Sequence, residues 1–165
     1  MISNQKFFHN TKILPVDKLI ENVLFNKKIG YYSSKNPFGK TGDFLTAPGI
    51  SNLFSEIIGI WLVSTWIAFG KPRKINIVEL GPGDGGLTKI LLSTFQKFPQ
   101  FNKATNFFLY EKSSLLKKLQ KKNISNPKVK WVNNFTSIKK GPVIFFGNEF
   151  FDSIPIKQFS RKKNI

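Results

Sequence analysis

The sequence predicts an α/β domain with a parallel sheet, and three observations support this fold class. Between residues 75 and 146, short apolar segments alternate with segments whose apolar residues recur at helical spacing. A glycine-rich turn at residues 81–86 connects the first apolar segment to the helical segment that follows it. Acidic residues lie near the ends of the apolar segments, where parallel α/β sheets bind their ligands. We therefore expect a binding site at the carboxyl edge of the sheet.

The N-terminal part, residues 1–49, is expected to contain one helix and a lid loop. Apolar residues recur at helical spacing over residues 15–25, and a loop of about 20 residues follows at residues 27–49. A loop of this length in a compact domain is usually functional or disordered. Its aromatic residues favour a packed lid, and a surface loop that they anchor is the alternative. These aromatic residues are Tyr31, Tyr32, Phe38 and Phe44.

The α/β domain itself is expected at residues 50–159, and residues 160–165 form a polar tail. One long apolar helix, residues 48–69, should cover one face of the sheet. The crossovers between parallel strands then place helices on both faces. The expected strands are residues 75–80, 107–110, 129–132 and 142–146, and the expected helices between them are residues 87–98 and 113–122.

The glycine turn fits two nucleotide-binding patterns. Gly81, Gly83 and Gly86 match G-x-G-x-x-G, the dinucleotide fingerprint, whereas Gly81, Gly83 and Gly85 match the G-x-G-x-G of methyltransferases. A dinucleotide site prefers an apolar residue at the strand end, but this chain has Glu79 there. A carboxylate suits the ammonium and sulfonium groups of S-adenosylmethionine. A tight turn without a ligand remains the structural alternative.

A second carboxylate follows the next predicted strand. Glu111 lies at its end, where the ribose hydroxyls of either cofactor would be held. The predicted fourth strand is followed by Glu149. Because the strands are parallel, we expect Glu79, Glu111 and Glu149 to lie on one rim of the sheet.

Charge and composition exclude several classes of protein. The 165 residues are 41% hydrophobic, enough for a folded core. Cysteine is absent and His9 is the only histidine, so we expect no disulfide, no metal site and a reducing compartment. The net charge is +17, but the lysines are scattered as an AT-rich genome would encode them, and nucleic acid is not the favoured partner. Seven of the nine acids lie in or near the motifs described here, which suggests that they are functional.

The N-terminus and the most apolar segment do not indicate a membrane protein. Residues 1–10 lack the apolar stretch of a signal peptide. The run at residues 57–69 is interrupted by polar residues and is shorter than the ~20 residues needed to span a membrane. We therefore expect a protein that does not span a membrane.

Three motifs together resemble one family. They occur in chain order at residues 42–48, 78–83 and 148–159, as GDFLTAP, VELGPG and NEFFDSIPIKQF. In this order they closely resemble the MidA-type family of class I S-adenosylmethionine-dependent methyltransferases, over about residues 30–159. The resemblance implies a Rossmann-like fold and an enzyme that methylates protein arginine. Members of this family include a mitochondrial protein that assists assembly of respiratory complex I.

The resemblance implies roles for particular residues. Glu79 and the turn would hold the methionine part of the cofactor, Glu111 the ribose hydroxyls, and Asn133 or Asn134 the adenine. Glu149 and Asp152 would fix the guanidinium of the substrate, although each also suits a helix-terminal or turn position. The full set of cofactor-binding candidates is Glu79, Gly81, Gly83, Gly85, Glu111, Asn148, Asp43 and Thr46. Of these, Asp43 and Thr46 would shape the lid, and a plain turn and helix cap is their alternative.

The chain departs from the family in length. Family members are roughly twice as long, and their seven-stranded sheet compares with about four strands here. The C-terminal strands are therefore expected to be missing, leaving an N-terminal, cofactor-binding half that is inactive alone or completed by a second chain. A non-catalytic binding or assembly module and a dinucleotide-dependent oxidoreductase remain alternatives. The expected partner is a protein substrate such as a complex I subunit, in a bacterial cytoplasm or a mitochondrial matrix.

Overall fold

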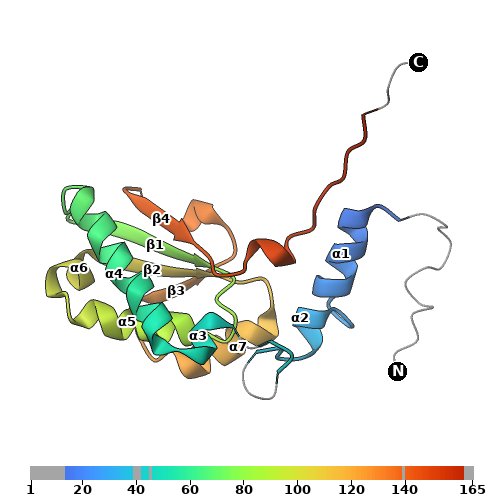
Figure 1. Ribbon diagram of the computed structural model, residues 1–165, viewed down its shortest axis with the longest axis horizontal. Helices are drawn as coiled ribbons and strands as arrows, with labels where there is room; N and C mark the ends of the chain where they lie inside the picture. Colours follow the sequence, from blue (N-terminus) through green and yellow to red (C-terminus); the bar gives the residue numbers. More distant parts are fainter. Residues whose placement is uncertain (1–13, 39–41, 45, 139, 162–165) are drawn as a thin grey trace.

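The fold is a four-stranded parallel sheet with helices packed mainly on one face (Figure 1). The computed structural model describes residues 14–38, 42–44, 46–138 and 140–161. The strand order is β3-β2-β1-β4, and all three pairings are parallel. This confirms the predicted parallel sheet and places the first strand at its centre. The strands are β1 (Ile75–Leu80), β2 (Thr105–Tyr110), β3 (Val129–Val132) and β4 (Val143–Phe146).

The strand register aligns the carboxyl ends of the strands. Leu80 of β1 pairs with Tyr110 of β2, and Tyr110 in turn pairs with Val132 of β3. On the other side of β1, Glu79 pairs with Phe146, the last residue of β4. The residues that follow these strands therefore leave the sheet at one edge, as parallel topology requires.

One face of the sheet carries the main hydrophobic core. The helices α4 (Asn52–Ala68), α5 (Gly86–Gln96) and α6 (Pro99–Ala104) contribute to this core. Phe95 and Phe101 meet edge to face with ring centroids 4.8 Å apart, and both are fully buried. Such pairs add to the free energy gained by burying their area. The other principal members are Leu62, Val63, Trp66, Ile75, Ile77, Leu91, Phe107 and Leu109.

The long helix predicted at residues 48–69 is interrupted. The short helix α3 (Ala47–Ile50) ends before Ser51, whose backbone is extended, and α4 begins after it. The Ser51 hydroxyl accepts a hydrogen bond from the Leu53 amide at 3.2 Å, which is an N-cap. The sequence predicted one continuous helix because the apolar spacing runs across this break, and the cap residue Ser51 does not interrupt it.

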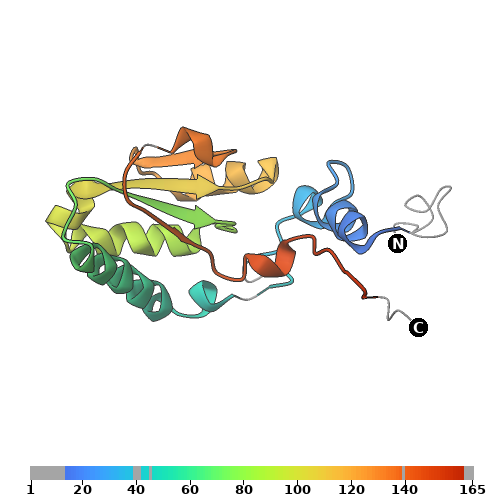
Figure 2. The same cartoon turned by 90° about the horizontal axis from the view of Figure 1, so that it is seen from above.

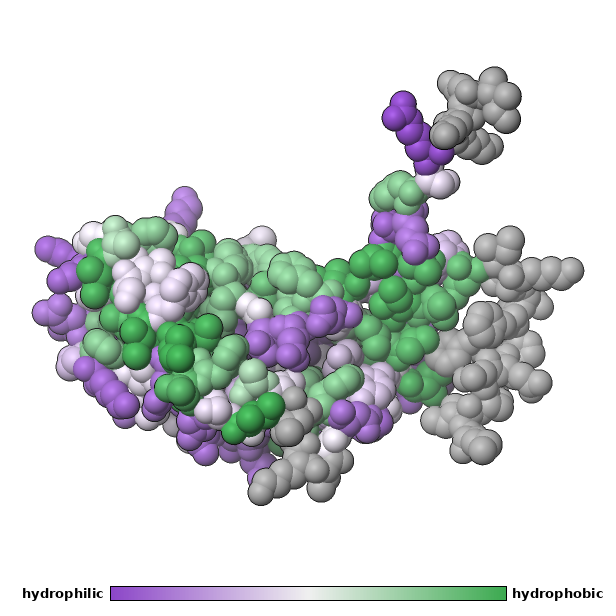
Figure 3. All heavy atoms as spheres, in the orientation of Figure 1, coloured by the Kyte–Doolittle hydropathy of each residue, from purple (hydrophilic) through white to green (hydrophobic). Residues whose placement is uncertain are grey.

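The outer face of α4 is also apolar and is exposed. Figure 3 shows apolar side chains gathered on this face of the molecule, over α3 and α4. A helix with apolar residues on more than one face is usually covered on those faces, but α4 is buried only where it meets the core. The exposed apolar residues of α3 and α4 are Ile50, Leu53, Ile57, Ile60, Trp61 and Ile67.

The second face of the sheet has a smaller core. Val78, Phe108 and Val132 are buried there. Over the described residues, the 3-10 helix η2 (Phe135–Ser137) covers part of this face, because Phe135 lies 5.0 Å from the Tyr110 ring and 5.2 Å from the Phe145 ring. Helices were predicted on both faces, but in the part of the chain that the structure describes most of them lie on the first face and only the short helix η2 on the second. Phe145 of the edge strand β4 is 44% exposed.

The N-terminal elements lie beyond the carboxyl edge of the sheet (Figure 2). They are α1 (Val16–Phe25), which confirms the predicted helix, and α2 (Tyr31–Ser34), which lies inside the predicted loop. The helix α7 (Ser114–Asn123) contacts α2, and the 3-10 helix η3 (Phe151–Ser153) follows β4. In the predicted tail, residues 160 and 161 are exposed without regular structure, and residues 162–165 lie outside the described ranges, as do residues 1–13.

Candidate cofactor-binding site

A cavity of about 450 Å³ lies at the carboxyl edge of the sheet, between the strand ends, the predicted lid and the segment after β4. Its wall brings together most of the residues predicted for the site, from four separate segments. These are Thr46, Gly81, Gly83, Glu111, Asn148, Glu149 and Asp152. The structure therefore places these residues along one cavity at the carboxyl edge of the sheet, and their role in binding stays a prediction. Asp43, Glu79 and Gly85 do not line the cavity.

The turn after β1 needs glycine at three positions. Gly81, Gly83 and Gly85 have φ values of 61°, 57° and 86°, which L side chains rarely adopt. A Cβ on Gly81 would lie 2.7 Å from Cδ2 of Phe150. At Gly85 it would lie 2.8 Å from Cδ1 of Ile124, on the side away from the cavity. Gly81 and Gly83 therefore form cavity wall, whereas Gly85 allows α7 to approach the turn.

Side chains on both sides of the turn hold it in place. The Asp84 carboxylate accepts a hydrogen bond from the Gly86 amide at 2.9 Å, at the start of α5. From α7, the Asn123 amide donates to the Asp84 carbonyl at 2.9 Å. The backbone at the cavity wall is thus fixed by local and long-range contacts, which suits a close approach to a ligand.

Glu111 is a buried carboxylate at the cavity wall. It follows β2 and is 7% exposed. Its Oε1 accepts from the Ser113 amide at 2.8 Å, and its Oε2 accepts from Nε2 of Gln120 at 3.3 Å. Burial raises the pKa of Glu111 above its usual value, and these hydrogen bonds oppose the rise. A carboxylate has about four acceptor positions, so Glu111 keeps capacity for ligand hydroxyls.

Glu79 lies beneath the turn and not at the cavity wall. Its side chain is 2% exposed, and its Oε2 accepts a hydrogen bond from the Thr88 hydroxyl of α5. Burial raises the pKa of Glu79 to about 7, against the Thr88 hydrogen bond, which lowers it. The sequence placed Glu79 correctly at the strand end. It did not show that the side chain of this strand position points into the core between β1 and α5.

The segment after β4 places two acids and a strained backbone at the cavity. Glu149 has φ 53°, a conformation that costs a non-glycine residue about 1 kcal/mol or more. The pKa of the Tyr32 phenol is raised by burial and then by the carboxylates of Asp152, Glu111 and Glu149. Acids from the segments after β2 and β4 therefore act on one tyrosine, and all three acids line the same cavity as Tyr32.

The predicted lid packs as a cluster of aromatic rings. Tyr32 stacks between Phe25 and Phe38, with ring centroids 5.7 Å and 6.3 Å away. The Ser113 hydroxyl, at the N-cap of α7, donates to the Tyr32 carbonyl at 2.6 Å. Residues 39–41 and 45 of the predicted loop lie outside the described ranges. Among the described residues, Tyr32, Phe38 and Phe44 line the cavity, which supports the packed lid.

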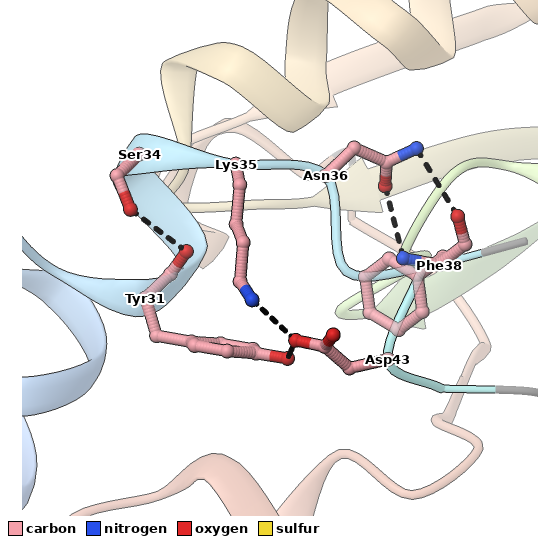
Figure 4. A network of polar contacts seen from close by, with 6 residues as sticks. All are labelled: Tyr31, Ser34, Lys35, Asn36, Phe38 and Asp43. Atoms are coloured by element: carbon pink, nitrogen blue, oxygen red, sulfur yellow. Dashed lines mark hydrogen bonds and ion pairs between the residues drawn. The ribbon is translucent and has the colours of Figure 1, made fainter. Parts of the chain in front are cut away.

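Asp43 holds the lid by a polar network with Tyr31 and Lys35 (Figure 4), and none of these three residues lines the cavity. Its carboxylate accepts hydrogen bonds from the Lys35 ammonium and the Tyr31 hydroxyl. These donors hold the pKa of Asp43 below its usual value, whereas burial and the Asp43 carboxylate raise the pKa of Tyr31 to about 12. The Phe44 amide also donates to the Pro37 carbonyl at 2.8 Å, which closes the loop.

Replacing Asp43 with asparagine should loosen the lid without unfolding the protein. The network is exposed, and exposed ion pairs contribute little to global stability. We expect faster hydrogen exchange at the Phe44 amide and a nearly unchanged melting temperature. Glu21→Gln, which removes the exposed Lys18–Glu21 pair on α1, is the matched control. A large drop in melting temperature would contradict a local role for Asp43.

Several cavity residues escaped the sequence reasoning. Tyr110 is the last residue of β2, and Lys112 and Leu116 flank the start of α7. Their position near the end of β2 was the available signal, but the prediction took only Glu111 from this segment. Asn133 and Asn134 do not line the cavity, and the Asn133 side chain accepts from Lys117. Over the described ranges there is no group of acids or histidines arranged to hold a metal ion.

Comparisons with known proteins agree with the fold and the motifs. A family described as "Putative S-adenosyl-L-methionine-dependent methyltransferase" matches residues 57–165. A crystal structure from Burkholderia thailandensis, of a protein bound to S-adenosyl-homocysteine, superposes with a TM-score of 0.69 at 24% identity. It covers 86% of this chain and 38% of that chain, and it shows the shared fold.

Curated relatives match nearly the whole chain. The "Protein arginine methyltransferase NDUFAF7 homolog, mitochondrial" of Drosophila melanogaster is 32% identical over 169 residues, covering 89% of this chain and 38% of that protein. The mouse protein arginine methyltransferase NDUFAF7 is 31% identical over 176 residues, covering 92% of this chain and 40% of that protein. The chain thus spans about two fifths of the length of these relatives. None of the helices in the described ranges has the length and apolar character needed to cross a membrane. On the family match and these relatives, the chain belongs to the MidA-type family of S-adenosyl-L-methionine-dependent methyltransferases.

Proposed function

We propose that the cavity binds S-adenosylmethionine and that the protein transfers its methyl group to an arginine side chain of a protein substrate. The observation that carries this proposal is the cavity wall itself, where the glycine turn, Glu111 and the two acids after β4 converge. Family membership supports the cofactor, and the names of the curated relatives support arginine as the acceptor. From the family resemblance, we further propose a subunit of respiratory complex I as the substrate.

The cavity residues suit separate parts of such a cofactor. Gly81 and Gly83 present backbone without side chains, so the methionine part approaches there. Glu111 accepts hydrogen bonds from the ribose hydroxyls, as strand-end acids do in related folds. Thr46 and Asn148 complete the wall around them. Glu79 supports the turn from beneath, through α5.

The two acids after β4 are suited to a guanidinium group. When bound, S-adenosylmethionine would supply an electrophilic methyl group for in-line displacement: the S–C bond would break as the N–C bond forms, S-adenosylhomocysteine would leave, and a carboxylate would accept the proton lost from the arginine nitrogen. Guanidinium is planar and stays protonated near neutral pH, and a carboxylate pair can hold its N–H groups in a fixed orientation. Glu149 and Asp152 are our candidates for this pair, and orientation of the nitrogen toward the methyl supplies much of the rate. The strained backbone at Glu149 supports a functional role.

The first experiment is calorimetric titration of the chain with S-adenosylmethionine, with NAD as the control ligand. Micromolar binding of S-adenosylmethionine without NAD binding is the expected result. Binding of NAD alone would replace the proposal with the dinucleotide alternative. Binding of neither ligand by a folded chain would contradict the cofactor assignment and favour a non-catalytic assembly module.

Replacing Glu149 with glutamine should separate cofactor binding from methyl transfer. Loss of one charged partner of the guanidinium removes about 1.5–3 kcal/mol, so the transfer rate to an arginine peptide should fall about tenfold or more. Affinity for S-adenosylmethionine should stay nearly unchanged. Glu149→Gly is the control for backbone strain. Glycine also lacks the carboxylate, but it adopts φ 53° without strain. Equal losses of binding and transfer in Glu149→Gln would contradict a substrate role.

A further inference from the structure

A completely buried amide lies behind the cavity wall. Gln120, on α7, has 0% of its surface exposed and is among the largest fully buried side chains. Burying an amide without partners is costly, so its hydrogen bonds show what holds it there. Nothing in the sequence singles out this residue, because the pattern of α7 is that of an ordinary amphipathic helix with its leucines inward.

Gln120 bonds to both sides of the cavity wall. Its Nε2 donates to the Gly83 carbonyl at 2.8 Å and to Oε2 of Glu111 at 3.3 Å. Its Oε1 accepts a hydrogen bond from Nε1 of Trp131 on β3 at 2.9 Å. One amide group therefore connects the turn after β1, the acid after β2 and a side chain of β3.

The orientation of this amide is determined by its neighbours. An indole N–H can only donate, whereas a backbone carbonyl and a carboxylate accept. Turning the amide over would place its oxygen against Gly83 and Glu111 and its NH₂ against Trp131, and all three hydrogen bonds would be lost. Trp131 thus selects the orientation in which Gln120 donates toward the cavity.

We propose that Gln120 is a positioning residue for the cofactor cavity. Its amide holds the Gly83 carbonyl and the Glu111 carboxylate in fixed positions relative to each other. This inference rests on the proposed function, since it assigns a purpose to residues of that same site. The Glu111 carboxylate has about four acceptor positions, more than its protein donors use, so one stays open for a ligand hydroxyl while Ser113 and Gln120 hold its plane. The turn that approaches the methionine part and the acid that accepts from the ribose are then aligned before the cofactor arrives.

Replacing Gln120 with methionine tests this role with little change in volume. Gly83 and Glu111 lose a shared donor, and we expect affinity for S-adenosylmethionine to fall about tenfold, the cost of a hydrogen bond to a charged group. Trp131→Phe removes the N–H that selects the orientation and should weaken binding in the same direction by a smaller factor. Gln96→Met, at an exposed position of α5, is the matched control and should bind as the wild type does.

Replacing Gln120 with glutamate gives a readout that a merely structural role would not move. When both groups are ionised, at higher pH, the new carboxyl and Glu111 repel each other, whereas at lower pH they share one proton and a donor is restored. The ratio of wild-type to Gln120→Glu affinity should therefore be larger at pH 8 than at pH 6. A ratio that does not change with pH would overturn the proposal.

A measurement without ligand separates this inference from the proposed function. Carbon-13 NMR titration of the Glu111 carboxyl should show a higher pKa in Gln120→Met than in the wild type, because the Gln120 hydrogen bond lowers it. An unchanged Glu111 titration would overturn the positioning role. If the wild type bound no S-adenosylmethionine but the Glu111 pKa rose, the cofactor assignment would fail and the structural link between Gln120 and Glu111 would stand.

Discussion

Alanine in place of Glu111 is expected to weaken S-adenosylmethionine binding by about a hundredfold. The carboxylate lies at the cavity wall and is held by Ser113 and Gln120. Two hydrogen bonds from ribose hydroxyls to a charged acceptor contribute about 1.5 kcal/mol or more each, and about 3 kcal/mol corresponds to this factor. Calorimetry at constant pH measures the change, and circular dichroism shows whether the variant is folded.

Two comparisons make the Glu111 result specific. Glu111→Gln keeps the size and one acceptor oxygen, so its affinity should lie between those of the wild type and the alanine variant. Adenine should bind both variants as weakly as it binds the wild type, because it has no ribose hydroxyls. If Glu111→Ala bound S-adenosylmethionine as tightly as the wild type, Glu111 would not be the ribose acceptor.

Glutamine in place of Glu79 is expected to remove a large part of the pH dependence of folding stability. The folded protein holds the pKa of this buried acid at about 7, well above its usual value of 4.5. Between these two pH values the folded state binds more protons than the unfolded state, so stability falls as pH rises. The shift corresponds to a loss of about 3 kcal/mol in the free energy of unfolding from pH 4.5 to 7.

The difference between wild type and variant isolates this residue. Glutamine keeps the shape and can still accept from Thr88, but it does not ionise. Urea unfolding at pH 5, 6, 7 and 8 should show that the free energy of unfolding depends less on pH in Glu79→Gln than in the wild type. The variant should therefore become more stable relative to the wild type as pH rises. Glu21→Gln, an exposed acid on α1, should follow the wild-type curve. Parallel curves for wild type and Glu79→Gln would show that Glu79 does not ionise in this pH range.

Much of the fold could be predicted because it follows from local patterns. The strands β1 and β3 and the helix α1 agree with the predicted segments to within a residue. Apolar periodicity and turn residues are properties of neighbouring positions, so they can be recognised without knowing which elements each segment packs against. The short helix α6 was missed because the phenylalanines around Pro99 read as the end of the preceding helix.

The chemistry of the site was predicted less completely. Acids at strand ends were identified because parallel strands must end at one edge, and Glu111 and Glu149 do line the cavity. Glu79 does not, because whether a strand-end side chain points to the cavity or into the core depends on strand alternation and on α5. Whether a strand-end acid faces the cavity or lies beneath the turn is therefore decided by the tertiary structure.

The sequence by itself determined the fold class, the glycine turn and the family of this protein, because each depends on residue types at short spacing. Only the tertiary structure decided that Gln120 connects Gly83 with Glu111, and that Tyr32 lies among the acids of the cavity. These contacts join segments far apart in the chain, and a buried amide or an aromatic ring takes its role from whichever partners folding brings to it.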